Sequence, residues 1–438
     1  MHENFEQITP IAVTNWRDIR KIFGIKQKNR RGHMYIIGKT GTGKTTLLAN
    51  MAISDIKQGN GLAVIDPHGD LSETILSHIP KERISDAIYF NPGDLEYPIA
   101  FNPLRKVPPD LHHLVVSGLI STFKKIWSDF WGPRLEHILR QSLFTLLEYP
   151  DSTLLDISRL LTEKEYRLKV LASVKNPHVL KFWKYEFDTY SKWLRSEAIS
   201  PILNKVGQFL TNLPLRNILG QVENTFSMRE VMDQGKILIV NLSKGKIGED
   251  NSTVLGSLIL NQLYLAAVSR ANIPEDKRKA FYLYVDEFHN FITLSFADML
   301  SESRKYGLNL IFAHQYIKQL LDKIKDAIFG NIGTLISFKV GVDDAYYLAK
   351  EFGPTFSHND LIALPNFELY IKLMIDGITS KAFSASTLPL PIPQYSFTED
   401  IIGESRKQYC TKRGVIEQRT NSTIDVNQES EKKQKKLF

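Results

Sequence analysis

The sequence predicts an α/β protein with a mostly parallel sheet, into which an all-helical domain is inserted. From residue 33 onward, short apolar runs rich in β-branched and aromatic residues alternate with longer helical segments, which is typical of β-α-β units. Between residues 110 and 233 the alternation stops, and apolar residues recur at helical spacing. The alternation then resumes as far as residue 390. We therefore expect one sheet domain made of residues 33–109 and 234–390, with an all-helical insertion at 110–233.

Composition places the chain among folded proteins. It has 438 residues, of which 43% are hydrophobic and 24% are charged, and these fractions exclude a disordered chain and a membrane-embedded one. Cys410 is its one cysteine, which excludes an intrachain disulfide and favours a reducing, cytoplasmic compartment. The net charge of +7 weakly favours a polyanionic partner.

No segment predicts a membrane anchor or a signal peptide. The apolar window from Val254 to Val268 is interrupted by Asn261 and Gln262 and is shorter than the roughly 20 residues that a bilayer requires. It predicts a buried helix.

The expected strands are short and mostly continuous in their hydrophobicity, as buried parallel strands are. They cover His33 to Gly38, Gly61 to Asp66, Ala87 to Asn91, Lys236 to Leu242, Phe281 to Glu287, Asn309 to Ala313 and Thr334 to Val340. Two further alternating strands flank Asp376-Gly377, a pair that supplies the positive φ angles of a tight hairpin, and we expect this hairpin to close one edge of the sheet. Residues 1–32 are expected to be a lead-in segment, and the polar, basic residues 391–438 a disordered tail.

The segment GKTGTGKTT follows the first expected strand and opens a helical pattern, and it satisfies G-x-x-x-x-G-K-[ST]. Its glycines let backbone N–H groups wrap an anion at a helix N-terminus. Lys44 is then expected to reach the β and γ phosphates of ATP, and the Thr45 hydroxyl to ligate Mg²⁺. The residues expected to bind the nucleotide are Gly38, Lys39, Thr40, Gly41, Thr42, Gly43, Lys44, Thr45 and Thr46.

A second motif, FYLYVDEFHNF, ends an apolar strand in two acids at the edge where open α/β sheets bind ligands. Asp286 is the expected Mg²⁺ holder, and Glu287 is the candidate base that polarises the attacking water. The alternative is a solvated acidic loop.

A third motif, SRKYGLNLIFAHQ, surrounds the next strand. Gln315 emerges beside the same phosphates, where it can hydrogen-bond water or the γ-phosphate. Arg304 precedes the strand, at the far end, so a neighbouring subunit's nucleotide is easier to reach than its own; it is a candidate arginine finger acting in trans. Lys305 is its rival, but it lacks the planar fork that suits phosphate. The alternative for Arg304 is a surface salt bridge.

The loop VIDPHGDL ends the second expected strand at the same sheet edge. Asp66 and His68 could monitor the nucleotide, or the loop could be a capped turn with Asp70 as the N-cap of the next helix.

Together these segments resemble the HerA/FtsK superfamily of RecA-like pumping ATPases, and within it the type IV coupling proteins of secretion and conjugation. The resemblance covers residues 15 to 390 and rests on HMYIIGKTGTGKTTLL, VIDPHGDL, FNPL, KILIVNLSKG, YVDEFHNF and SRKYGLNLIFAHQ, which follow the family order. It implies that Arg304 is a trans finger and Gln315 a sensor, in a ring that is a hexamer in the family. It also implies that the insertion is the helical domain implicated in DNA and substrate engagement.

Membrane-bound coupling proteins begin with transmembrane helices, and none is predicted here. We therefore expect a cytoplasmic ATP-driven DNA translocase, reaching the membrane through a separate partner. Its expected partners are the sugar-phosphate backbone of DNA, further copies of itself, and secretion-channel or relaxosome proteins. The alternatives are a soluble HerA-like DNA helicase or translocase, a nucleotide-dependent scaffold that recruits proteins, and a protein-export motor.

Overall fold

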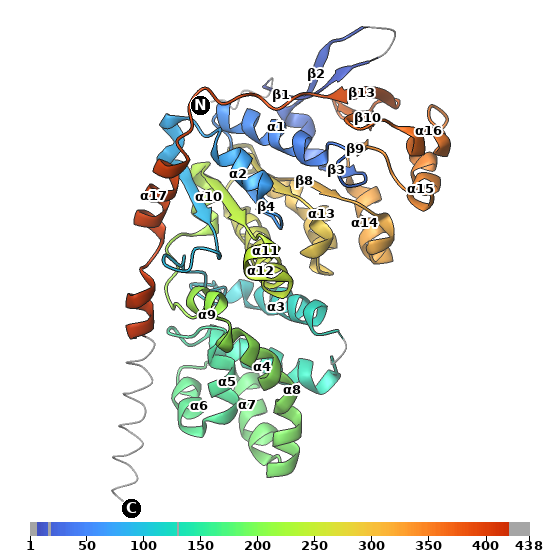
Figure 1. Ribbon diagram of the computed structural model, residues 1–438. Helices are drawn as coiled ribbons and strands as arrows, with labels where there is room; N and C mark the ends of the chain where they lie inside the picture. Colours follow the sequence, from blue (N-terminus) through green and yellow to red (C-terminus); the bar gives the residue numbers. More distant parts are fainter. Residues whose placement is uncertain (1–6, 16–18, 129–130, 420–438) are drawn as a thin grey trace, which may run out of the picture. The chain divides into compact units, whose positions relative to one another are not determined.

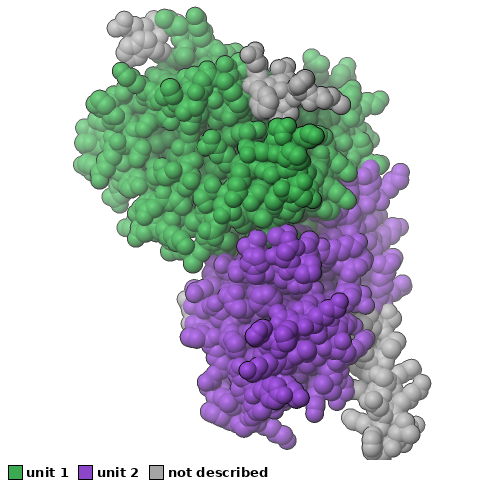
Figure 2. Space-filling model, turned by 180° about the vertical axis from the view of Figure 1, so that it is seen from behind, with its two compact units in different colours: residues 1–90, 227–404 green, residues 91–226, 405–438 purple. Residues whose placement is uncertain are grey.

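The computed structural model describes residues 7–15, 19–128 and 131–419 of the chain. They fall into two compact units, which Figure 2 shows in different colours. Unit 1 consists of residues 1–90 and 227–404, and unit 2 of residues 91–226 and 405–438. The sequence predicts an insertion at 110–233, which begins later than unit 2 does in the structure. Residues 91–108 form no regular helix or strand, so no pattern in the sequence assigns them to a unit.

Unit 1 is built on an eleven-stranded sheet with the order β2-β1-β13-β10-β9-β3-β8-β7-β4-β6-β5 (Figure 1). The strands from β9 to β5 are parallel, and the remaining four join them antiparallel. The parallel strands are β3 (Met34–Ile37), β4 (Gly61–Asp66), β5 (Ala87–Phe90), β6 (Ile237–Asn241), β7 (Phe281–Val285), β8 (Leu308–His314) and β9 (Thr334–Ser337). Each expected parallel strand therefore has its counterpart, and the predicted fold class is confirmed.

The hairpin around Asp376-Gly377 forms, but its predicted place at the sheet edge is wrong. Its long strands, β10 (Glu368–Lys372) and β13 (Phe383–Thr387), lie inside the sheet order, and a separate two-stranded ribbon of β11 (Met374–Ile375) and β12 (Ile378–Thr379) carries the turn. The edge is instead formed by β1 (Ile8–Thr14) and β2 (Ile22–Lys26), from the segment expected to be a lead-in. A register shift between Pro10, which has no N–H to donate, and Ala12 interrupts the alternation that would have revealed β1.

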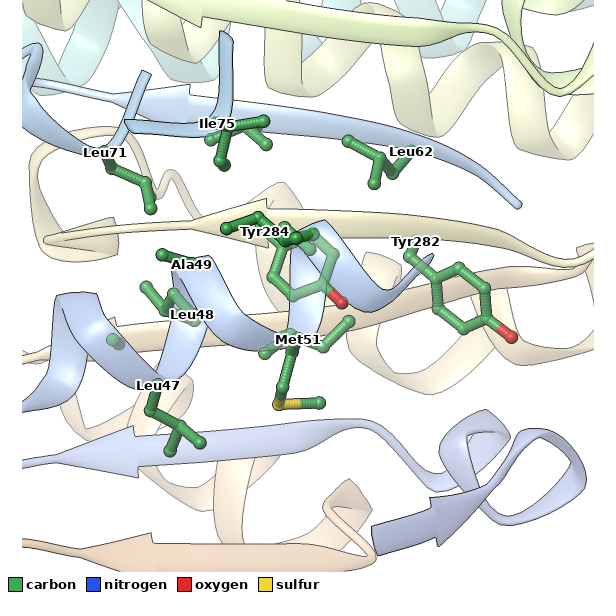
Figure 3. Packing of buried hydrophobic residues seen from close by; sticks show 14 of the residues in the cluster. Leu47, Leu48, Ala49, Met51, Leu62, Leu71, Ile75, Tyr282 and Tyr284 are labelled. Carbon is green, nitrogen blue, oxygen red and sulfur yellow. The ribbon is translucent and has the colours of Figure 1, made fainter. Parts of the chain in front are cut away.

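One face of the sheet is covered by α1 (Lys44–Lys57) and α2 (Asp70–Leu76) (Figure 1). Alternate strand residues such as Val64, Tyr284 and Ile311 pack there against apolar residues of both helices. Figure 3 shows Met51 of α1 and Tyr284 of β7 in this packed layer. The layer fixes the helix that follows the glycine-rich segment against the strand that ends in the two acids.

The other helices of unit 1 lie between the strands from β5 to β10 along the chain. Their bounds are α10 (Met228–Gln234), α11 (Lys244–Ile247), α12 (Glu249–Ser269), α13 (Ser295–Glu302), α14 (Asp322–Asn331), α15 (Val342–Phe352) and α16 (His358–Ala363). In the described residues, the segment Glu249–Asn272 is the one helix long and apolar enough to cross a membrane, and 78% of its most apolar window is buried in the structure. The helix is longer than the window from Val254 to Val268 indicated, so the prediction that it is too short to span a bilayer is wrong, but the expected burial is confirmed.

Unit 2 is helical in all the elements that its described residues form between positions 112 and 219. These are α3 (His112–Ile126), α4 (Pro133–Leu147), α5 (Asp156–Thr162), α6 (Lys164–Leu171), α7 (Pro177–Tyr185), α8 (Lys192–Thr211) and α9 (Leu213–Leu219), joined in places by short 3₁₀ turns. Its core contains Trp127, stacked on Phe123, and Trp183, packed edge-on against Phe187.

The prediction of a disordered tail from residue 391 is wrong for part of that segment. Residues Thr398–Tyr409 form α17, and residues 413–419 are also helical. Ile401, Ser405 and Tyr409 are buried and recur every fourth residue, so the helix has one buried stripe that the low mean hydropathy of the segment conceals. The prediction for residues 420–438 lies outside the described residues.

A buried ion pair links the lead-in segment to the helix and strand that carry the motifs. The Arg30 guanidinium donates to both Asp55 carboxylate oxygens, at 2.6 and 2.9 Å, and to the Tyr284 hydroxyl at 2.7 Å. Both charged side chains are fully buried. Asp55 lies on α1 and Tyr284 on β7, so the pair joins the helix that begins after the glycine-rich segment to the strand that ends before the two acids.

Because removal of one partner leaves a buried charge without compensation, Asp55→Ala should lower the free energy of unfolding by about 3–5 kcal/mol. Denaturant unfolding followed by circular dichroism measures this loss. The double variant Arg30→Met/Asp55→Leu is the control and should recover most of it, since an apolar pair removes both charges. A single variant as stable as the parent would contradict the prediction.

Candidate active site

The glycine-rich segment forms a loop between β3 and α1, held at both sides by neighbouring strands. The Gly38 N–H donates to the His314 carbonyl at the end of β8, at 3.3 Å, and the Lys39 N–H donates to the Lys339 carbonyl beyond β9, at 2.8 Å. Gly41 and Gly43 have φ angles of 75° and 116°, which side chains disfavour. The loop therefore curls at the carboxyl edge of the sheet, where α/β proteins bind ligands.

Two of the glycines are required by close packing as well as by the loop path. A Cβ at Gly38 would lie 2.6 Å from the Cβ of Phe338, and a Cβ at Gly43 would lie 3.1 Å from ring atoms of both Phe338 and Phe367. Phe338 is fully buried, so it cannot move aside. The buried side chain of Phe338 thus limits the shape of the loop from outside.

Lys44, the first residue of α1, points back into the loop. Its ammonium donates to the carbonyls of Gly38 and Lys39, at 2.7 and 3.1 Å, and lies 4.0 Å from Glu287 Oε1. Burial lowers the pKa of Lys44, and the charges of Glu287 and Asp286 oppose this effect. A buried cation held by carbonyls on the inner side of such a loop is suited to an anionic ligand.

Thr45 and Asp286 meet across the loop. The Thr45 hydroxyl donates to Asp286 Oδ2 at 3.0 Å, and Asp286 Oδ1 accepts from the Glu287 N–H at 2.9 Å. A hydroxyl beside a carboxylate is an oxygen-only pair, which fits Mg²⁺ when phosphates and waters complete the coordination. The described residues contain no group of three or more His, Cys, Asp or Glu arranged for a metal.

Glu287 has a strained backbone, and one of its carboxylate oxygens accepts a hydrogen bond. Its backbone is left-handed, with φ 43° and ψ 48°, and the residue is buried. Gln315 Nε2 donates to Glu287 Oε1 at 2.7 Å, while His289 Nδ1 lies 3.4 Å from Oε2. The sequence analysis did not single out His289, although its position in the same motif as Glu287 was a sufficient signal.

The side chains of His314 and Asp66 contact other groups of the protein. His314 is fully buried, its Nδ1 lies 3.2 Å from the Tyr35 hydroxyl, and burial together with the charge of His289 lowers its pKa to about 3. Asp66 accepts hydrogen bonds from the N–H groups of His68 and Ser72, at 2.9 and 2.8 Å. It therefore supports the start of α2, which is the role that the sequence analysis assigned to Asp70.

Arg304 lies apart from this group. It is exposed in a 3₁₀ turn, Ser303–Tyr306, that precedes the amino end of β8, whereas Gln315 follows the carboxyl end. The seven residues of β8 span roughly 20 Å at about 3.3 Å each. The structure therefore brings together Lys44, Thr45, Asp286, Glu287 and Gln315, but not Arg304.

Protonation of Asp286 makes the stability of the folded protein depend on pH. Burial, with repulsion from Glu287 and Asp66, raises the pKa of Asp286 from 3.8 to about 6. Because the folded state holds this proton more tightly than the unfolded state, the buried charge destabilises the fold above about pH 6, and this penalty disappears as the pH falls towards about 4.

Asp286→Asn has no charge at any pH, so it should stabilise the nucleotide-free protein by up to about 3 kcal/mol at neutral and higher pH. The gain should shrink between about pH 6 and pH 4. Thermal unfolding in metal-free buffer across this range measures it, with the exposed Asp326→Asn as the control. A gain that does not depend on pH would contradict the prediction.

Comparisons with known proteins agree with this geometry. The sequence matches the family model of the type IV secretion-system coupling protein DNA-binding domain over residues 18–355. A search of curated proteins finds no match.

Among solved structures, the coupling protein TrwBΔN70 in complex with sulphate is 15% identical, with a TM-score of 0.61 over 90% of this chain and 96% of that chain. TrwB in complex with ADP and Mg²⁺ is 14% identical, with a TM-score of 0.59 over the same shares of 90% and 96%. VirB4 of Thermoanaerobacter pseudethanolicus is 14% identical, with a TM-score of 0.55 over 89% and 99%. At these identities the likeness is one of fold.

The family model covers well over half of the chain, and the sheet, the glycine-rich loop and the paired acids have the arrangement of a RecA-like P-loop nucleoside triphosphatase. The chain belongs to the family of type IV secretion-system coupling protein DNA-binding domains.

Proposed function

We propose that this protein is an ATP-driven DNA translocase of the type IV coupling protein kind, which hydrolyses ATP at the subunit interfaces of a ring. The observation that carries the proposal is the grouping around Lys44: Thr45 bonded to Asp286, and Glu287 held by Gln315. This grouping supplies a phosphate cradle, oxygen ligands and a buried carboxylate within one small site. A site that only bound nucleotide would not need a buried glutamate with a strained backbone, such as Glu287.

The residues present fit ATP with Mg²⁺. Lys44 would exchange its carbonyl partners for β and γ phosphate oxygens, and Thr45 and Asp286 would hold the metal, Asp286 through water. Mg²⁺ bound there would neutralise charge that develops on the phosphates. Glu287 would accept a proton from the attacking water, and Gln315, already bonded to Glu287, would orient that water or the γ-phosphate.

The position of Arg304 supports catalysis between subunits. Its guanidinium is exposed at the opposite end of β8 from Gln315, so it is placed to meet a neighbour rather than its own nucleotide. A planar, permanently charged guanidinium beside a neighbour's γ-phosphate would stabilise the transition state. We take the ring to be a homo-hexamer, as the family resemblance implies.

DNA is the proposed substrate of the motor. The net charge of +7 and the sequence pI near 9.1 favour a polyanion, and the family to which the chain belongs is described as a DNA-binding domain. The contacts would be made mainly to sugar and phosphate, without base specificity. Secretion-channel or relaxosome proteins are the proposed partners that would hold this cytoplasmic motor at the membrane.

Steady-state ATP hydrolysis by the full chain, with and without long duplex or single-stranded DNA, tests the proposal. We expect strong stimulation by DNA that is lost in Glu287→Gln. Turnover that does not respond to DNA would favour a protein-export motor, and nucleotide binding without turnover would favour a recruitment scaffold. Stimulation accompanied by strand separation would favour a HerA-like helicase.

A further inference from the structure

Phe367 is a strained and exposed aromatic residue that touches the phosphate-binding loop. Its φ angle is 65°, in the left-handed region, and the residue is 50% exposed. Its ring atom Cδ1 would lie 3.1 Å from a Cβ at Gly43, so the ring lies directly against the loop. The left-handed backbone of Phe367 costs about 1–2 kcal/mol, and burial of its exposed ring does not offset that cost. This combination suggests that the ring has a function.

Main-chain bonds fix Phe367 in this position. Its N–H donates to the Thr42 carbonyl at 2.8 Å, and its own carbonyl accepts from the Thr387 N–H at 2.7 Å. Both bonds use backbone atoms only, so a glycine would make them without strain. The aromatic side chain is therefore not required by the local structure of the loop.

The strand order places Phe367 on the side of the loop away from the catalytic acids. In the sheet, β8 and β7 lie on one side of β3 and end in Gln315 and the Asp286-Glu287 pair, whereas β9 and β10 lie on the other side. Because β10 runs antiparallel to β9, its first residues lie at the carboxyl edge of the parallel strands. Phe367 precedes β10 and so stands at the same edge as the loop.

This arrangement gives a bound nucleotide a direction. Lys44, Thr45 and Glu287 define the end where the γ-phosphate must lie, on the side of β7 and β8. The nucleoside then extends from the loop towards β9 and β10, where the exposed ring of Phe367 lies. An aromatic ring stacks on any nucleobase, since every base has a π face.

We propose that Phe367 is the stacking platform for the purine base of the nucleotide. This inference rests on the proposed function, because it assumes that the loop binds ATP. Stacking alone carries no hydrogen-bond code, so the platform would accept adenine and guanine with similar affinity and pyrimidines less well.

The test is the full-length Phe367→Trp variant, whose new indole reports directly on a stacked base. Mg·ATP should quench the emission of this tryptophan saturably. Tripolyphosphate has the phosphates but no base, so it should leave the emission unchanged and, in competition, should reverse the quenching by ATP. The parent protein, with its exposed Trp193 in unit 2, corrects for non-specific quenching.

Affinity measurements on side-chain variants complete the test. Phe367→Ala and Phe367→Gly should each weaken ATP binding by about tenfold, equivalent to about 1.4 kcal/mol, while binding of tripolyphosphate stays as in the parent. The glycine variant relieves the backbone strain, so agreement between the two variants isolates the ring. Phe367→Tyr should restore ATP affinity.

The outcomes separate the two proposals. ATP that binds without quenching Phe367→Trp, or with parental affinity in Phe367→Ala, would overturn the platform and leave the proposed function standing. Failure of both ATP and tripolyphosphate to bind the parent protein would overturn the proposed function and the platform together.

Discussion

Glu287→Gln should lower the turnover number for ATP hydrolysis by about 10²–10⁴-fold and leave ATP binding nearly unchanged. The amide keeps the size of the side chain, but it cannot accept a proton from the attacking water. In the parent, Gln315 donates to Oε1 at 2.7 Å and holds the carboxylate in place, while Lys44 lies 4.0 Å from the same oxygen. The loss should therefore appear in kcat rather than in KM.

Steady-state kinetics with a separate measurement of ATP affinity distinguish these effects. Glu351→Gln is the matched control, since Glu351 lies on the surface helix α15 and pairs only loosely with Lys372, at 3.8 Å. A Glu287→Gln variant that turns over ATP at a rate near that of the parent would exclude Glu287 as the base.

Arg304→Ala should lower turnover by about 10³–10⁵-fold if the side chain acts as an arginine finger on the neighbouring subunit. Lys44→Ala should also abolish hydrolysis, because it removes the cation inside the loop. When the two inactive variants are mixed, some interfaces combine an intact Lys44 with a neighbour's intact Arg304. Part of the parental activity should then return.

Differently tagged variants make this mixing experiment decisive, since co-purification shows whether mixed assemblies have formed. Lys305→Ala is the control, because Lys305 is the adjacent cation and pairs with Glu302 at 3.7 Å on its own surface. Arg304→Lys should remain strongly impaired, since an ammonium lacks the planar fork. Mixed assemblies without recovered activity would contradict catalysis in trans.

The parallel part of the fold could be predicted from the sequence because buried parallel strands leave a strong local signal. Strands such as β4 and β7 are short and almost wholly apolar, and β7 is followed directly by the two acids of the site. The loop from Gly38 to Gly43 and the paired acids Asp286 and Glu287 are also local patterns. Their convergence follows from the rule that parallel strands share one carboxyl edge.

The features that sequence reasoning missed depend on contacts between distant segments. β1 is a strand because it pairs with β13 and β2, and its interrupted alternation gives little sign of this. Phe367 meets the loop only because β10 runs antiparallel beside β9, and no spacing near Phe367 encodes that pairing. α17 was missed because its buried stripe lies in a polar segment.

The order of strands in the sheet also bears on how the chain reaches its native state during synthesis. β3, which leads into the phosphate-binding loop, pairs with β8 and β9, whose residues are made about 280 and 300 positions later. Such high contact order slows folding, whereas helices of unit 2, such as α3 and α4, find partners close in sequence. A nascent chain halted before Leu308 would hold the loop without either neighbouring strand, so nucleotide binding should begin only after β8 and β9 have both been synthesised.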